Sequence, residues 1–98
     1  MIQMNVLFSE PDKNIQRASE LVKSAKAKGA QICVLPECMD LGWGNPDANS
    51  LAEPVPGKVS DAYQKIAAAN RVFLVAGLTE KEHEKIYNTA LLISDEGE

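Results

Sequence analysis

The sequence lacks several features that would mark a specialised class of protein. Its longest apolar run, residues 72–78, is far shorter than the roughly 20 residues needed to span a bilayer. It has no excess of positive charge, since ten basic and fourteen acidic residues leave a net charge of −4, which gives no electrostatic reason to bind nucleic acid. We therefore expect neither a membrane nor a nucleic acid among its partners.

Cysteine and histidine are scarce as well, with two cysteines and one histidine among 98 residues. Cys33 and Cys38 form neither a disulfide framework nor a zinc pattern, and Cys33 lies in an apolar run where a thiol packs as a small hydrophobe. His83 stands alone in EKEHEK, without a metal spacing such as HExxH, so we expect a solvated side chain. We predict no metal site and name no cofactor.

The first residues, MIQMNVLF, lack the positively charged start and the small-residue cleavage site of a signal peptide. Together with cysteines that form no framework, this predicts a cytoplasmic protein. What the sequence does have is ordinary, because 45% apolar and 24% charged residues are globular values. A length of 98 residues suits one small domain, so residues 1–98 are expected to form a single unit.

The first half of the chain alternates between strand and helix patterns. Residues 1–8 alternate apolar and polar side chains, which predicts a strand, and the apolar run at 32–35 predicts a second. Between them, residues 14–28 carry apolar side chains at the spacing of one helix face. A strand, a helix and a strand with short joints predict a parallel pair with a right-handed crossover.

The second half repeats this pattern after a long connection at residues 38–57. A helix is predicted over residues 58–70, followed by a strand covered on both faces at 71–78. The charged segment 79–85 is expected to be a loop, and residues 86–94 a fourth strand, antiparallel to the third. The predicted fold class is therefore α/β, a βαβαββ unit.

Two right-handed crossovers that step the same way across a sheet place both helices on one sheet face. The other face would be bare, and a large apolar surface in water invites association. The last residues, DEGE, indicate a turn that ordinarily leads into a returning strand. We expect the missing layer to come from further chain, which makes residues 1–98 the N-terminal part of a truncated domain, or from another copy in a homo-oligomer.

One stretch, QICVLPECMDLGWG at residues 31–44, has the form of a site. Its buried strand is stopped by Pro36, and Glu37 follows at the carboxyl end, where open α/β sheets bind ligands. Most loop carboxylates are solvated, so a turn carboxylate in water is the competing interpretation. Trp43, in the long connection behind Glu37, could line a pocket there or hold the loop onto the body.

The same residues resemble the first-glutamate motif of the nitrilase, or carbon-nitrogen hydrolase, superfamily. VLPECMDLGW is similar to that motif's apolar strand, Pro, Glu and loop leading to Gly and an aromatic residue. Further family segments are resembled in the same order by NIQRASELVKSAKAKGAQ, AEPVPGK, VFLVAGLTE and IYNTALLISDEGE. Several weak motifs in order are more specific than one, and they favour the functional interpretation of Glu37.

The resemblance implies a four-layer αββα sandwich and hydrolysis of amides, nitriles or carbamoyl groups through a Cys, Glu and Lys set. Glu37 matches the general base of that set, and Trp43 becomes a candidate for substrate binding. The Lys and the Cys nucleophile belong to family motifs downstream of the DEGE turn, so no residue here takes those roles. Cys38 directly follows Glu37 and would point away from it in an extended backbone, which favours packing. Tyr87 and Asn88 match a family position of structural support.

Three functions stay open from the sequence. The first is the N-terminal part of a thiol amidohydrolase that acts on a small amide or nitrile and is inactive alone. The second is a non-catalytic, self-associating α/β module. The third is a flavodoxin-like binding domain, which would need a glycine-rich phosphate loop after the first strand, where SEPDKN stands instead.

Overall fold

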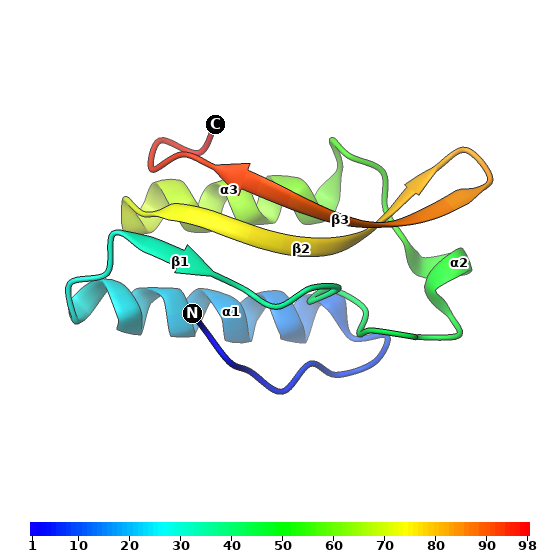
Figure 1. Ribbon diagram of the computed structural model, residues 1–98, viewed down its shortest axis with the longest axis horizontal. Helices are drawn as coiled ribbons and strands as arrows, with labels where there is room; N and C mark the ends of the chain where they lie inside the picture. Colours follow the sequence, from blue (N-terminus) through cyan, green and yellow to red (C-terminus); the bar gives the residue numbers. More distant parts are fainter.

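The computed structural model describes all of residues 1–98 as a three-stranded sheet with helices (Figure 1). The elements, in chain order, are α1 (Pro11–Ala27), β1 (Ile32–Val34), α2 (Ala48–Leu51), α3 (Lys58–Asn70), β2 (Phe73–Glu82) and β3 (Lys85–Ile93). The strand order is β1-β2-β3, with β1 parallel and β3 antiparallel to β2. These pairings confirm the second predicted crossover, which joins residues 32–35 to the next strand in parallel, and the predicted antiparallel hairpin.

Both long helices lie where the apolar spacing predicts them. Helix α1 begins at Pro11, three residues before the predicted start, because proline fits the first helical position, whose N–H would have no helical partner. Helix α3 has the predicted bounds. Its start is closed by the Gly57 N–H, which donates to Ser60 Oγ at 2.8 Å, and its end by Arg71 in the left-handed conformation.

The helices pack on one face of the sheet and form the core there. Leu74, Ala76 and Leu78 of β2 are fully buried and cluster with Val22 of α1 and Tyr63 of α3. Figure 1 shows α3 passing behind β2 and β3, and α1 and α3 contact one another. Both predicted helices therefore share one sheet face. None of the helices combines the length and the apolar character needed to cross a membrane.

The opposite face of the sheet is uncovered. Ile32 of β1 and Phe73 of β2 are paired neighbours and remain 62% and 42% exposed. On β3, Leu92 lies beside Val75 and is 74% exposed. Side chains alternate between the faces of a sheet, so these residues point away from the helices. We call this surface the bare face.

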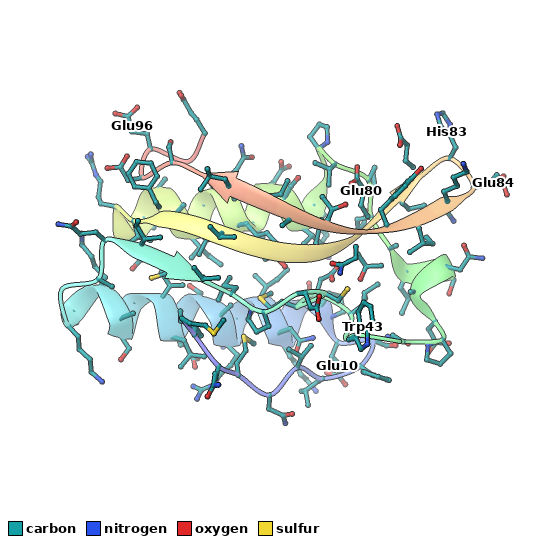
Figure 2. All side chains as sticks on the ribbon, in the orientation of Figure 1. Glu10, Trp43, Glu80, His83, Glu84 and Glu96 are labelled. Carbon is teal, nitrogen blue, oxygen red and sulfur yellow. The ribbon has the colours of Figure 1, made fainter.

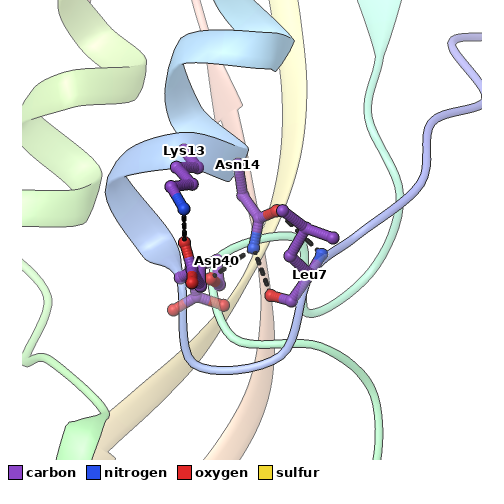
Figure 3. Close-up of polar contacts among 5 residues, drawn as sticks. Leu7, Lys13, Asn14 and Asp40 are labelled. Carbon is purple, nitrogen blue, oxygen red and sulfur yellow. Dashed lines mark hydrogen bonds and ion pairs between the residues drawn. The ribbon is translucent and has the colours of Figure 1, made fainter.

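The strand predicted over residues 1–8 is not formed. Only the Ile2 N–H reaches β1, where it donates to the Val34 carbonyl at 2.8 Å. Further along, the Leu7 N–H and carbonyl bind the Asn14 side chain, which draws this segment onto the start of α1 (Figure 3). The alternating apolar side chains of this segment still pack on the core, where three of them are half-buried, namely Ile2, Met4 and Val6.

The loop predicted over residues 79–85 is also wrong in most of its length. Strand β2 continues to Glu82 and β3 begins at Lys85, so only His83 and Glu84 form the turn. The charged residues alternate between the faces of a two-stranded ribbon whose backbones pair. Glu82 is exposed, whereas Glu80 and Lys81 are half-buried and bind Thr89 and the Asn49 carbonyl. His83 has φ +56° and is exposed. Figure 2 shows its side chain at the tip of the hairpin, which agrees with the expected solvated side chain.

Candidate functional site

The site begins at the C-terminal end of β1, where the regular hydrogen bonds between β1 and β2 stop. The Leu35 N–H still donates to the Val75 carbonyl at 2.8 Å, but the next backbone bond to β2 comes only from the Met39 N–H, which donates to the Gly77 carbonyl at 3.3 Å. Residues 37–41 then form a turn, which is closed by the Gly42 N–H donating to the Cys38 carbonyl at 2.8 Å. Glu37 therefore stands at the carboxyl end of the strand, as the sequence predicts.

Gly77 of β2 lets this turn cross the bare face. A Cβ at Gly77 would lie 2.6 Å from Glu37 Cα and 2.7 Å from the Pro36 carbonyl oxygen, both of which are backbone atoms. Position 77 faces away from the helices, because its neighbours Ala76 and Leu78 are buried in the core. The close approach puts Glu37 on the bare side of the sheet.

The Glu37 carboxylate is exposed and has one hydrogen-bond partner, Asn88 of β3. Asn88 Nδ2 donates to Glu37 Oε2 at 3.2 Å, across 51 positions of sequence. Asn88 pairs with Thr79 in the hairpin, so it reaches Glu37 from the neighbouring strand. The sequence assigns Asn88 only structural support, and its contact with Glu37 becomes visible once the hairpin register is known.

Trp43 lines a pocket of about 220 Å³ next to Asn88. Its side chain is 66% exposed, which does not fit an aromatic plug that holds the loop down. Glu37 itself does not line this pocket, but the Asn88 side chain contacts Glu37 and also faces the cavity. Other lining residues come from the long connection and the hairpin, among them Cys38, Asn45, Ala48, Thr79, Ile86 and Tyr87.

Cys38 is buried behind Glu37, with its Sγ 3.6 Å from Asn88 Oδ1. Burial raises the pKa of the Cys38 thiol, and the nearby carboxylates of Asp40 and Glu37 raise it further. A thiol that stays protonated is a poor nucleophile, because the thiolate is the reactive form. This environment favours packing as the role of Cys38.

Asp40 is a second carboxylate of this turn, and sequence reasoning misses it. Its side chain is almost fully buried, and its Oδ1 accepts a hydrogen bond from the Thr79 N–H at 2.9 Å. Its backbone carbonyl accepts from Asn14 Nδ2, also at 2.9 Å, as Figure 3 shows. Asp40 Oδ2 has no partner, and burial raises the pKa of this carboxyl group. The only sequence signal is an acid that closely follows Glu37 in ECMD.

Comparison with known proteins gives one family. The model of the family described as Carbon-nitrogen hydrolase matches residues 1–98. A nitrilase of Pyrococcus abyssi is 35% identical over 100 residues, which cover 98% of this chain and 38% of that protein. An omega-amidase of Xenopus tropicalis is 34% identical over 86 residues, which cover 87% of this chain and 31% of that protein. The chain thus spans about a third of the length of the curated relatives it matches.

Solved structures agree on the fold. An amidase from Nesterenkonia sp. matches with a TM-score of 0.88 at 21% identity, over 99% of this chain and 38% of that chain. A CN-hydrolase superfamily protein from Xanthomonas campestris matches with a TM-score of 0.87 at 19% identity, over 100% of this chain and 36% of that chain. The backbone of residues 1–98 is therefore part of this α/β fold, as predicted.

Proposed function

We propose, on the premise that this chain belongs to the carbon-nitrogen hydrolase family over residues 1–98, that it is the part of a hydrolase that carries the general base, Glu37. The observation that supports this most directly is the place of Glu37. It lies at the end of β1, crosses over Gly77 onto the bare face, and is held there by Asn88. A carboxylate in such a position is open to a substrate bound between this sheet and a covering layer.

In the chemistry we propose, a cysteine thiolate attacks the carbon of the amide or nitrile and forms a covalent intermediate. Glu37 takes the proton of the thiol and passes it to the departing nitrogen as the C–N bond breaks. It then takes a proton from the water that attacks the covalent intermediate, and returns it to the cysteine sulfur as the acid product leaves. Asn88 donates a hydrogen bond to Glu37 Oε2, which leaves Glu37 Oε1 free to accept the proton. A lysine stabilises the negative charge that develops on the tetrahedral species. We assign neither the nucleophile nor this lysine to any of residues 1–98.

We propose a small amide as the substrate, with Trp43 in the wall of its pocket. The cavity beside Trp43, about 220 Å³, is smaller than the roughly 300–1,000 Å³ typical of pockets for drug-sized ligands. Similar proteins agree with an amide, since they include omega-amidases and an amidase solved in complex with butyramide. Asn88, which contacts Glu37, belongs to the same wall.

The decisive experiment substitutes Glu37 in the longest available form of the protein and measures amide hydrolysis. Because general base catalysis contributes about 10²–10⁴-fold, we expect Glu37→Gln to lower kcat by that factor. The matched control is Glu96→Gln, an exposed carboxylate in the C-terminal turn, which should leave kcat unchanged. Turnover retained in Glu37→Gln would refute the role of Glu37. We expect residues 1–98 alone to show no turnover, with or without this substitution.

A non-catalytic, self-associating module is the alternative function, and the bare face is the observation that favours it. Ile32, Phe73 and Leu92 present large apolar side chains to water on one side of the sheet. A second copy of the chain could cover this face, which is the homo-oligomer expected from the sequence. The two proposals differ in turnover: only the hydrolase loses an activity when Glu37 is replaced.

A further inference from the structure

The edge of β2 beside β1 has an unusual set of backbone partners. Near its start, β2 pairs with β1, and the last regular bond runs from the Leu35 N–H to the Val75 carbonyl. Further along, the Met39 N–H donates to the Gly77 carbonyl at 3.3 Å, and the Lys81 N–H donates to the Glu53 carbonyl at 2.9 Å. Between these two contacts, the Thr79 N–H has no backbone carbonyl opposite it.

The Asp40 side chain fills this gap. Its Oδ1 accepts from the Thr79 N–H at 2.9 Å, at a place where Asp40 is 1% and Thr79 5% exposed. A buried backbone N–H without a partner is costly, so this edge needs an acceptor where the strand has ended. The carboxylate takes the place of the carbonyl that a continuing strand would have provided.

Asp40 is held from a second side by α1. The Asn14 side chain, itself 1% exposed, donates from Nδ2 to the Asp40 carbonyl at 2.9 Å (Figure 3). Asp40 thus joins the first turn of α1 to β2. Its partner in β2, Thr79, is 39 positions away in sequence. The turn that contains Glu37 is fixed at its far end by these two bonds and at its near end by β1.

We propose that Asp40 is a positioning residue for Glu37. By supplying the acceptor that β1 no longer provides, the Asp40 carboxylate holds the 37–41 turn against β2, and this keeps Glu37 above Gly77 and within reach of Asn88. The inference rests on the proposed function of Glu37 for its catalytic meaning. The placement it describes is a property of residues 1–98 and is measurable without turnover.

The test compares Asp40→Ala with Asp40→Asn by NMR on the 98-residue chain. Asparagine keeps an oxygen that can accept from the Thr79 N–H, whereas alanine keeps none. In Asp40→Ala we expect the Thr79 amide to exchange with solvent about 10- to 100-fold faster, as for a buried donor that has lost its partner. We also expect the nuclear Overhauser contact between the Asn88 side-chain amide and Glu37 to disappear. Asp40→Asn should restore both signals.

The control is Val22→Ala, a core substitution in α1 that lowers stability and removes none of the hydrogen bonds that hold the turn. It should leave the contact between Asn88 and Glu37 intact. The proposal is overturned if Asp40→Ala keeps that contact, or if Val22→Ala loses it to the same extent.

If Asp40→Ala does not fold, the hydrogen bond between Asp40 and Thr79 is tested in the unmodified chain instead. A scalar coupling across the hydrogen bond, from the Thr79 nitrogen to the Asp40 carboxyl carbon, is expected, and its absence would refute the bond. Failure of the proposed function is a separate result, because it would appear as turnover retained in Glu37→Gln with these signals unchanged.

Discussion

Position 77 has no room for a side chain, and this constraint sets the path of the turn at residues 37–41. We expect Gly77→Ala to cost about 1–3 kcal/mol of unfolding free energy, as overpacked sites do, because the new Cβ meets the backbone of Pro36 and Glu37. Denaturant unfolding measures the loss. We also expect the contact between Glu37 and Asn88 to weaken, since the turn must lift away from β2.

Gly29→Ala is the control for Gly77→Ala. Gly29 also has a strained setting for alanine, with φ +94°, but a Cβ there meets no atom within 4 Å. It should therefore destabilise the chain and leave the contact between Glu37 and Asn88 unchanged. Equal effects of both variants on this contact would show that a general loss of stability, and not collision at Gly77, weakens it.

Asp40 should give the stability a pH dependence of known sign. Burial raises the pKa of Asp40 above its ordinary 3.8, so the folded chain binds this proton more tightly than the unfolded chain. The contribution of Asp40 to stability is then fully present below pH 3.8 and is lost as the pH rises through the folded pKa. The neighbouring Cys38 and Tyr63 stay neutral there, because burial raises the pKa of both.

The measurement is the unfolding free energy of Asp40→Asn minus that of the unmodified chain, followed from pH 3 upwards. Asparagine does not titrate, so the difference should move in favour of the variant as the pH rises from about 3.8. A difference that is constant over this range would contradict a raised pKa for Asp40.

The Asn14 side chain connects three elements, namely the N-terminal segment, α1 and the turn after β1. It bonds the N–H and carbonyl of Leu7 and the carbonyl of Asp40. We expect Asn14→Ala to cost at least about 1–3 kcal/mol, because buried backbone groups lose their partner. Asn14→Asp should not rescue it, since an oxygen would replace the Nδ2 that donates to two carbonyls. Chemical denaturation measures both variants.

Arg17→Ala, on the exposed side of the same helix, is the matched control for Asn14→Ala. Its ion pair with Glu20 is exposed at both ends, and such pairs contribute about 0–1 kcal/mol. If Asn14→Ala is no more destabilising than Arg17→Ala, the Asn14 side chain does not hold these elements together.

The sequence predicts the elements whose pattern is local. Helix α3 has the expected bounds because its apolar residues recur at helical spacing and Gly57 precedes it. The charged end of β2 is missed because it is a strand only through distant partners, namely β3 along its length and Glu53 at one bridge. The predicted N-terminal strand fails for a similar reason, since Asn14 captures the backbone of Leu7.

The same distinction applies within the site. Glu37 is predictable because Pro36 marks the strand end next to it in the chain. Asn88 and Asp40 are not predictable in this way. Their partners are 51 and 39 positions away, and only the register of β2 with β3 and the path of the turn bring them together.

The whole molecule presents one sheet face to water, and this should govern its behaviour in solution. We expect the 98-residue chain to sediment as a species larger than a monomer, because Ile32, Phe73 and Leu92 gain by being removed from water. Replacing both Ile32 and Leu92 by lysine should shift it to the monomer.

Leu51→Lys is the control for this association, because Leu51 is as exposed as Phe73 but lies on α2, away from the sheet face. It should leave the sedimentation unchanged. A single monomeric species from the unmodified chain would contradict association through the bare face.

Glu37 and the exposed side chains of Phe73 and Leu92 lie on the same side of the sheet. A layer that covers these apolar side chains would also cover Glu37 and exclude water from it. Under the proposed function, covering the sheet and enclosing the substrate site would therefore be a single step.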